Sequence, residues 1–212
     1  MSREESEYDK RAADRLIFFS DAVVAIAITL LAIDLPVPTG ATAGEFWSSV
    51  KQHDGAYVSF LVSFYVIAAA WSHHHTVFKY LRTTDTRLRN LNLVWLLTIV
   101  LIPFATRLLT GYEQDTPAVH ALRFAFYALL QTAASAALLL LGRHMAAAGL
   151  LADEAAPRAA AADWASYGMI IGFGLSIPVF FATTYGWVLW FAGPLLVPRL
   201  GRAYRRRSAA GE

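Results

Sequence analysis

The stretch RLIFFSDAVVAIAITLLAI, residues 15–33, decides the fold of this chain. It carries charge only at Arg15 and Asp21, and after Asp21 it is apolar apart from Thr29. A helix needs about 20 mostly apolar residues to cross roughly 30 Å of hydrocarbon. The stretch therefore predicts a membrane-spanning helix, which Pro36 and Pro38 bring to an end.

Five further apolar segments predict an all-α integral membrane protein with six transmembrane helices. Of the 212 residues, 57% are hydrophobic and only 16% are charged, which is more apolar than is usual for soluble domains. The short turn at Thr184-Tyr185-Gly186 makes the last two spans an antiparallel hairpin, and Phe46–Val50 predicts a short interfacial helix. The predicted spans are 16–35, 55–81, 88–109, 119–141, 164–184 and 187–200, within a transmembrane domain of residues 15–204 between tails at 1–14 and 205–212.

The basic residues predict how the chain is oriented in the membrane. They gather at the N-terminus, around residues 79–89, and after residue 199. Cytoplasmic loops carry an excess of Lys and Arg, so we expect both termini to be cytoplasmic. The same placement at the ends of spans argues against nucleic acid as the partner of these charges, although the isoelectric point is near 9.

The sequence shows no catalytic motif. It contains no cysteine, no Gly-x-Ser-x-Gly elbow and no phosphate-binding Gly-rich loop, so we expect neither an enzyme nor a cofactor. The run His73-His74-His75 does not predict a zinc site, because consecutive helical residues point about 100° apart. We expect instead a polar cluster near Trp71 at the cytoplasmic end of the second span.

Ionisable residues inside a span usually face a partner or a wet cavity. Arg15 and Asp21 lie roughly 9 Å apart along the helix and some 240° around it, so they are not an ion pair within one helix. Asp21 is then either a hydrated residue at the interface or part of a buried polar cluster with another helix, the better candidate being the helix that carries His74.

An apolar stripe follows Asp21 along the same helix. Ile26, Leu30 and Ile33 have the spacing i, i+4 and i+7, which places them on one face. Such a stripe is more often ordinary packing than the wall of a pore. Thr29 lies beside it and either bonds to a carbonyl of its own helix or faces water. The chain has no Thr-Val-Gly-Tyr-Gly filter, so a conducting protein would have to select ions by another device.

These residues resemble the bacterial branch of the transmembrane protein 175 family of potassium channels, whose animal relatives act in lysosomes. The resemblance covers roughly the first half of the chain, and the later spans match only in hydropathy and length. It rests on two blocks: Arg15-x-x-x-Phe19-Ser20-Asp21-Ala22 with Ala25-Ile26-x-Ile28-Thr29, and Trp71-x-x-His74 with Phe78, Thr84-Asp85, Leu88, Asn92-Leu93 and Leu101-Ile102-Pro103-Phe104.

The resemblance implies a potassium-permeable homotetramer in the bacterial plasma membrane, with the first helix of each subunit lining a central pore. It implies that a narrow apolar constriction controls conduction, and that selectivity for K+ over Na+ is modest. Residue by residue, it assigns the constriction to Ile26, Leu30 and Ile33 and a selectivity position to Thr29. It also implies a buried polar network, which maps to Arg15, Ser20, Asp21, Trp71 and His74.

Two other functions stay open. A secondary transporter, coupled to protons through Asp21 and His74, is the main alternative, although neither inverted repeats nor broken helices stand out in the sequence. A membrane scaffold that does not conduct is the third possibility.

Overall fold

The computed structural model describes residues 3–110, 116–152 and 156–209, and in these residues the chain is almost entirely helical. The helices are α1 (Arg3–Ile33), α2 (Ala43–Gln52), α3 (Asp54–Phe78), α4 (Thr86–Leu108), α5 (Pro117–Ala147), α6 (Ala156–Phe180) and α7 (Val188–Ala209), with a short 3-10 helix at Thr184–Trp187. The predicted all-helical membrane fold is confirmed.

Five of the six predicted spans fall in helices long and apolar enough to cross a membrane: those in α1, α3, α4, α5 and α6. The sixth falls in α7, whose side chains are described only in part. The predicted tails are helical where the structure describes them, since α1 begins at Arg3 and α7 runs to Ala209. Residues 1–2 and 210–212 of those tails lie outside the described part of the chain.

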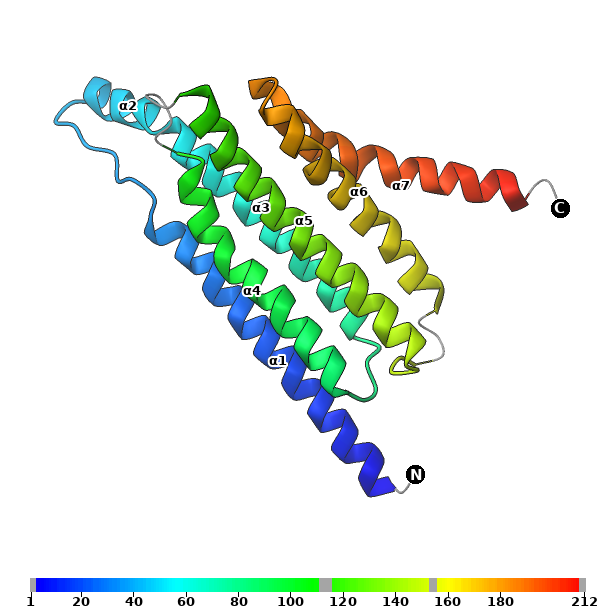
Figure 1. Ribbon diagram of the computed structural model, residues 1–212. Coiled ribbons are helices and arrows are strands. Elements are labelled where there is room, and N and C mark those ends of the chain that lie inside the picture. The colour runs from blue at the N-terminus through cyan, green and yellow to red at the C-terminus, as the bar shows by residue number, and fades with distance from the viewer. Residues whose placement is uncertain (1–2, 111–115, 153–155, 210–212) are drawn as a thin grey trace.

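Helices α1, α3, α4 and α5 run side by side along one common direction (Figure 1). Helix α4 packs against both α1 and α5, and α1 also touches α3. The centre of the bundle is filled by large side chains that are fully buried, among them Trp95, Ile99, Ile102 and Tyr127. Among the described residues α1 packs against α3 and α4, and from residue 7 onward one of its sides stays open.

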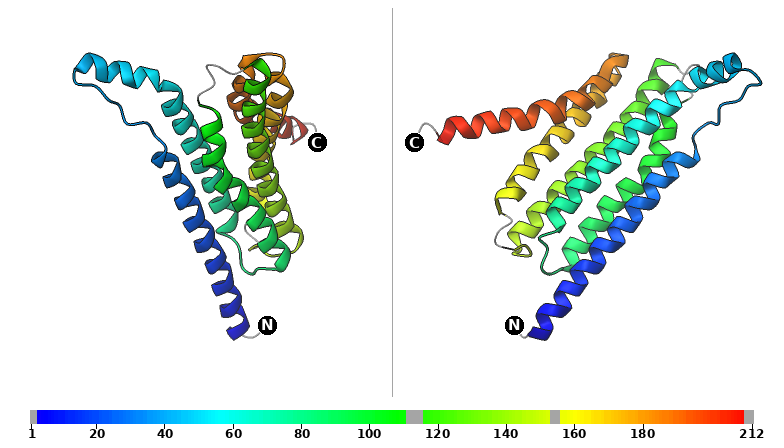
Figure 2. Two further views of the ribbon diagram at one scale, coloured as in Figure 1. Left: turned by 60° about the vertical axis from the view of Figure 1, so that its left-hand side comes forward. Right: turned by 180° about the vertical axis from the view of Figure 1, so that it is seen from behind.

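Helices α6 and α7 form the predicted hairpin, which packs on the bundle mainly through α5 and α6. Their closest approach uses glycine: a Cβ added at Gly193 would lie 2.5 Å from the carbonyl oxygen of Gly168 and 2.5 Å from the Cα of Gly172. Small residues let two membrane helices approach in this way. Away from this contact the two helices diverge towards their far ends (Figure 2).

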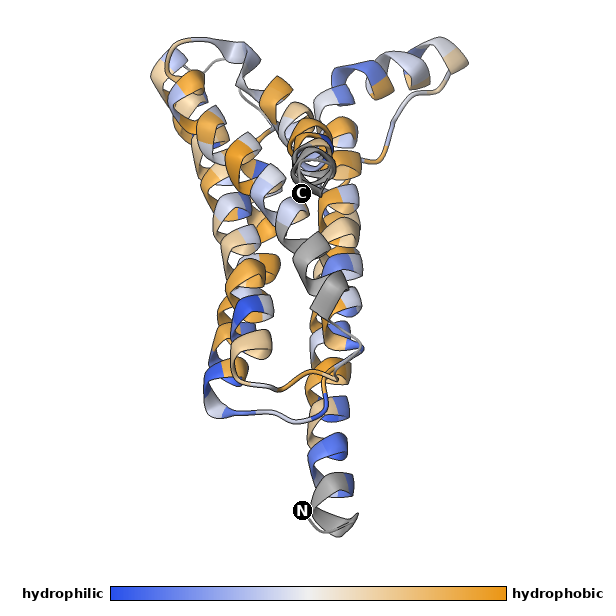
Figure 3. Ribbon diagram, turned by 90° about the vertical axis from the view of Figure 1, so that its right-hand side faces the viewer, coloured by the Kyte–Doolittle hydropathy of each residue, from blue (hydrophilic) through white to orange (hydrophobic). Residues whose placement is uncertain are grey.

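Polar residues mark the two ends of the bundle. Figure 3 shows hydrophilic residues concentrated in α2 and in the N-terminal turns of α1. Thr42 caps α2 by accepting a hydrogen bond from the Glu45 amide at 3.2 Å, and Glu45 accepts one from the Ala41 amide at 2.8 Å. These two hydrogen bonds resemble a capping box and fix the start of α2. The helix lies at the end of the bundle opposite the N-terminus, as an interfacial helix would (Figure 1).

The two connections at the N-terminal end of the bundle are tied together by backbone. The Arg82 amide donates to the Leu150 carbonyl at 2.9 Å, and the Ala152 amide donates to the Tyr80 carbonyl at 3.0 Å. The α3–α4 and α5–α6 connections are therefore held next to each other. This contact fixes the register of α4 relative to α5, which matters for the polar contacts below.

Candidate functional site

Helix α1 presents one face to the rest of the protomer. Its buried residues are Ala13, Ser20, Val24, Ala27 and Leu31, whose spacing of 7, 4, 3 and 4 traces a single stripe. This stripe packs against α4 and α3. Small side chains and one hydroxyl dominate it, so the backbones come close and only a few directed contacts set the register.

The apolar stripe predicted as a pore wall lies on a different face. Ile26 is 60% exposed, Leu30 is 40% exposed and Ile33 is 74% exposed, so the protomer leaves all three without cover. At 100° per residue the centre of this stripe lies about 130° around the helix from the buried stripe. A second element, a second protomer, lipid or an aqueous pathway must therefore face it in the membrane.

Thr29 lies on the same exposed side of α1. Its hydroxyl donates a hydrogen bond to the Ile26 carbonyl at 2.8 Å, three residues earlier rather than the expected four, and the side chain is exposed at the same time. The oxygen keeps its lone pairs, which remain available on the exposed face.

A buried chain of hydrogen bonds joins three helices behind the stripe. The Asn92 amide of α4 donates to the Ser20 hydroxyl of α1 at 2.8 Å, and its carbonyl oxygen lies 2.9 Å from Nε2 of His74 in α3. Ser20 itself donates to the Leu16 carbonyl at 2.9 Å. Ser20, His74 and Asn92 are each 0–1% exposed. With the Asn92 carbonyl as acceptor, Nε2 of His74 is assigned as the donor.

Aromatic rings clamp the His74 imidazole on both faces. The Phe78 ring is stacked on it at a centroid distance of 3.8 Å, and the Trp95 ring at 4.2 Å. The rotation of the imidazole is thereby restricted, and one nitrogen is aimed at Asn92. Asn92 is the central member of this chain of hydrogen bonds. From the sequence, Asn92 belongs to the family motif but was not included in the predicted polar network. An amide inside an otherwise apolar span is the signal that could have revealed it.

The other residues of the predicted network lie apart from this chain. Trp71 donates its indole N–H to an Asp21 carboxylate oxygen at 2.8 Å, in a contact that is exposed in the protomer. Among the described residues no contact joins Arg15 to Asp21, Trp71 or His74, and Arg15 is exposed. The predicted set is thus divided in the protomer into a buried chain (Ser20, His74), a separate Asp21–Trp71 pair and a solitary Arg15. The role of each residue stays a prediction.

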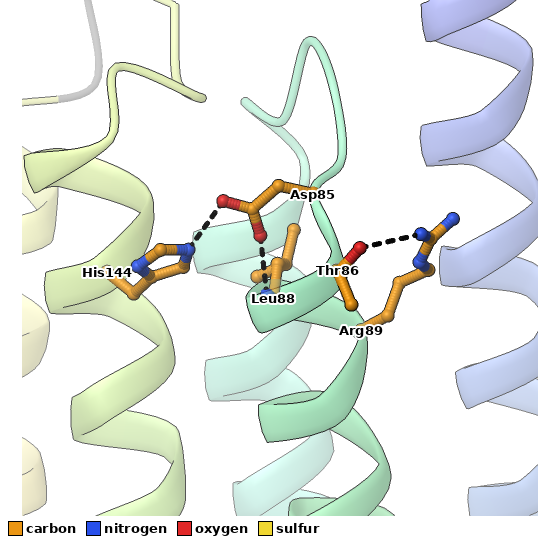
Figure 4. A network of polar contacts seen from close by, with 5 residues as sticks. All are labelled: Asp85, Thr86, Leu88, Arg89 and His144. Carbon is orange, nitrogen blue, oxygen red and sulfur yellow. Dashed lines mark hydrogen bonds and ion pairs between the residues drawn. The ribbon is translucent and has the colours of Figure 1, made fainter.

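A third polar contact lies where α4 begins (Figure 4). Asp85 caps α4 by accepting a hydrogen bond from the Leu88 amide at 2.6 Å, and its other oxygen lies 2.8 Å from Nε2 of His144 in α5. The hydrogen bond from the Leu88 amide, together with the neighbouring His144 and Arg87, holds the pKa of Asp85 below its ordinary value, although burial acts in the opposite direction. One carboxylate therefore fixes both the start of α4 and the end of α5.

The opposite end of α1 carries a weaker contact. Arg107 of α4 lies 3.5 Å from Asp34, which directly follows α1, and both side chains are solvent-exposed. An exposed pair of this kind contributes little to stability. It does show that the carboxylate at this end of the stripe already has a cation beside it, which lowers its power to attract further cations.

Comparison with known proteins identifies the family. A family model described as the endosomal/lysosomal potassium channel TMEM175 matches residues 15–103. A protein named potassium channel in Streptomyces collinus is 37% identical over 139 residues, which are 66% of this chain and 67% of the relative. A protein of the same name in Chamaesiphon minutus is 38% identical over 101 residues, 46% of this chain and 49% of the relative.

The fold agrees with a solved structure. The crystal structure of a lysosomal potassium-selective channel TMEM175 homolog from Chamaesiphon minutus matches with a TM-score of 0.72 over 91% of this chain and 98% of that chain, at 24% sequence identity. The human endosomal/lysosomal proton channel TMEM175 is 26% identical over 108 residues, only 21% of its length. Ser20, Asp21, Trp71, His74 and Asn92 all fall within the residues 15–103 that the family model matches. This chain belongs to the TMEM175 family of potassium channels.

Proposed function

We propose that the protein is a potassium-permeable channel that works as a homotetramer, with four copies of α1 around a central pore. The observation that carries the proposal is the uncovered apolar stripe of Ile26, Leu30 and Ile33, in a helix whose other face is packed against its own protomer. Four such stripes facing one axis would cover each other and leave a narrow apolar passage. Membership of a channel family favours this arrangement over simple exposure to lipid.

The physical chemistry of the passage accounts for gating and for modest selectivity. Ile and Leu side chains offer no lone pairs, so an ion that passes them keeps part of its water shell or loses it at high cost. Potassium gives up water more easily than sodium, which favours it without any coordinating group. When the passage narrows, the column of water breaks and conduction stops, as in other hydrophobic gates.

Flux measurements on liposomes test the gate. We expect purified protein to carry K+ into liposomes, and Ile26→Asn and Leu30→Asn to raise the flux severalfold because a polar ring stays wet. Leu129→Asn is the matched control, since Leu129 is 56% exposed but lies on α5. An unchanged flux in both α1 variants, or an equal increase in the control, would show that the stripe does not gate.

The selectivity and the assembly need separate tests. The reversal potential with K+ on one side and Na+ on the other should shift towards zero in Thr29→Val, if the hydroxyl contributes to the preference for K+. Light scattering in detergent should give a protein mass four times the 23.3 kDa of one chain. A dimeric or monomeric mass would remove the central pore from the proposal.

We infer further that the channel lies in the plasma membrane with both termini in the cytoplasm. The chain has no cysteine, so a single cysteine introduced at Thr83 or Thr39 can be labelled without background. A membrane-impermeant maleimide added to whole cells should label the variant at Thr39 and spare the one at Thr83. Single-channel recording decides the remaining alternative, because a secondary transporter coupled through Asp21 and His74 gives no unitary currents.

A further inference from the structure

A cavity of about 630 Å³ lies inside the membrane-spanning part of the protomer, away from α1. Five helices line it: α3, α4, α5, α6 and α7, with Tyr65, Ala134, Met169 and Phe173 among the apolar walls. This volume lies in the range of pockets that hold small organic ligands. The ion pathway proposed above does not use the cavity, because none of its lining residues belongs to α1.

Two residues that line the same cavity each carry a buried hydrogen-bond donor without an acceptor in the described part of the chain. The Gln131 side chain is 2% exposed and its Nε2 has no partner among the described residues. Trp95 is 0% exposed and its indole Nε1 likewise has none. Gln131 also lies near the hydroxyl of Tyr127, one turn earlier in α5. An amide nitrogen carries two N–H groups, so that neighbour would still leave one of them for the cavity.

Leaving such donors unpaired is costly in hydrocarbon. A buried donor without a partner costs about 1–3 kcal/mol, and no bulk water is present in the bilayer core to compensate. By contrast, the indole of Trp190, which also lines the cavity, donates to Ser176 at 2.8 Å. Among the described residues that line the cavity, Gln131 and Trp95 carry the unpaired donors.

The charge and depth of the cavity define the ligand. His73 is among the lining residues, but no Asp, Glu, Lys or Arg is, so an ionised carboxylate or phosphate would find no permanent counter-charge there. Trp95 and Gln131 lie about 15 Å and 20 Å, by helix rise, from the Asp85–His144 contact at the end of the bundle, and thus near the middle of a layer of roughly 30 Å. Phospholipid ester groups stay near the interface, so the acceptor must belong to a molecule that enters the hydrocarbon.

We propose that this cavity binds an uncharged, lipophilic carbonyl compound, whose oxygen accepts hydrogen bonds from Nε2 of Gln131 and Nε1 of Trp95 while its apolar body fills the space between α3 and the α6–α7 hairpin. Alkylated quinones are the probe that matches this chemistry, because they are neutral, carry carbonyl oxygens and dissolve in the bilayer core.

The test uses the full-length protein in nanodiscs of a dialkyl-ether phospholipid, which contains no other carbonyl. Decyl-naphthoquinone is titrated while quenching of tryptophan fluorescence is recorded. We expect saturable quenching, weakened about threefold to tenfold in Gln131→Leu, which is the loss of one hydrogen bond at a dry site. Thr132→Val is the matched control, because Thr132 is the next residue of α5 and its hydroxyl bonds to the Ala128 carbonyl instead. Ala134→Leu should block the cavity.

Two further readouts separate ligand binding from a structural role. The infrared carbonyl band of the bound quinone should lie at lower frequency in the wild type than in Gln131→Leu, and Trp95→Phe should shift it in the same sense if the first variant does not fold. Decylnaphthalene, which has the same shape but no carbonyl, should displace the quinone poorly. Quenching that never saturates, equal affinity in Gln131→Leu, or displacement by decylnaphthalene at equal concentration would each overturn the proposal.

Discussion

Replacing Asn92 by leucine tests the buried hydrogen-bond chain most directly. The change keeps the approximate volume of the side chain and removes two hydrogen bonds, to Ser20 at 2.8 Å and to His74 at 2.9 Å. Ser20 keeps its bond to the Leu16 carbonyl, whereas Nε2 of His74 loses its acceptor between two stacked rings. The cost should therefore arise mainly at His74.

The size of the effect follows from these contacts. Hydrogen bonds between membrane helices contribute about 0.6 kcal/mol each on average, and a buried donor left without a partner costs about 1–3 kcal/mol. Asn92→Leu should thus lower the free energy of unfolding by about 2–4 kcal/mol. Ser20→Ala leaves the buried Asn92 amide without its acceptor but keeps His74 paired, so it should cost somewhat less than Asn92→Leu, about 1–3 kcal/mol.

Reversible unfolding in mixed micelles, or steric trapping in bicelles, measures these free energies. Asn90→Leu is the matched control: it is the same chemical change two residues earlier in α4, at an exposed position, and should stay within about 0.5 kcal/mol of wild type. A double-mutant cycle with His74→Phe should show coupling, since His74 no longer needs an acceptor once it is replaced. If Asn92→Leu is no more destabilising than Asn90→Leu, the chain of hydrogen bonds does not stabilise the fold as reasoned.

Three more predictions concern contacts outside that chain. Gly193→Ala should destabilise the α6–α7 hairpin by about 1–3 kcal/mol, because the new Cβ would lie 2.5 Å from backbone atoms of α6. Gly174→Ala is the control: its Cβ would contact only Thr132 side-chain atoms, at 3.8 Å or more, so the same unfolding assay should show little change. Because the pKa of Asp85 is lower in the folded than in the unfolded protein, its carboxylate stabilises the fold above the unfolded value of about 3.9 and loses this contribution as pH falls through the folded value. The stability difference between wild type and Asp85→Ala, about 1 kcal/mol near neutrality, should therefore shrink below about pH 4, and a difference that persists there would contradict the assignment. Arg107→Gln should change stability by less than about 1 kcal/mol, since its partner Asp34 lies 3.5 Å away at an exposed site, and a larger loss in the same assay would mean that the pair is shielded from solvent.

Hydropathy was sufficient to place the spans, because crossing a bilayer demands long apolar runs. Hydropathy did not predict how far the helices continue beyond the spans. The fourth span was expected to end near residue 141, with the option that its helix continues toward residue 151; α5 does continue, to Ala147, and its last turn carries the His144 that contacts Asp85. The fifth span was expected over residues 164–184, and the part of the chain there that is apolar enough to cross a membrane is Trp164–Ala182, but helix α6 itself already begins at Ala156 in an alanine-rich stretch. Alanine favours a helix without adding the hydropathy that marks a span.

The contacts of the candidate site depend on register between helices, which one sequence does not contain. Asp21 was expected to meet the helix that carries His74, in a network that includes Trp71; it does meet α3, through Trp71, but in a contact that is exposed in the protomer. One turn of offset between α1 and α3 decides which side chain faces the carboxylate. Similarly, Asn92 reaches both Ser20 and His74 only because α4 packs against α1 and α3 at one particular height.

The two faces of α1 imply that folding and conduction respond to different substitutions. The face with Ser20, Val24 and Ala27 is buried within the protomer, so changes there should lower its stability whether or not it conducts. Ile26 and Ile33 are mostly exposed in the protomer, so polar replacements there cost it no internal contact and should act on assembly or flux. Exposure alone would equally suit lipid, which is as apolar as leucine. A variant such as Ile26→Asn that conducts more while its protomer stays as stable is therefore the outcome that separates a pore wall from a packing surface.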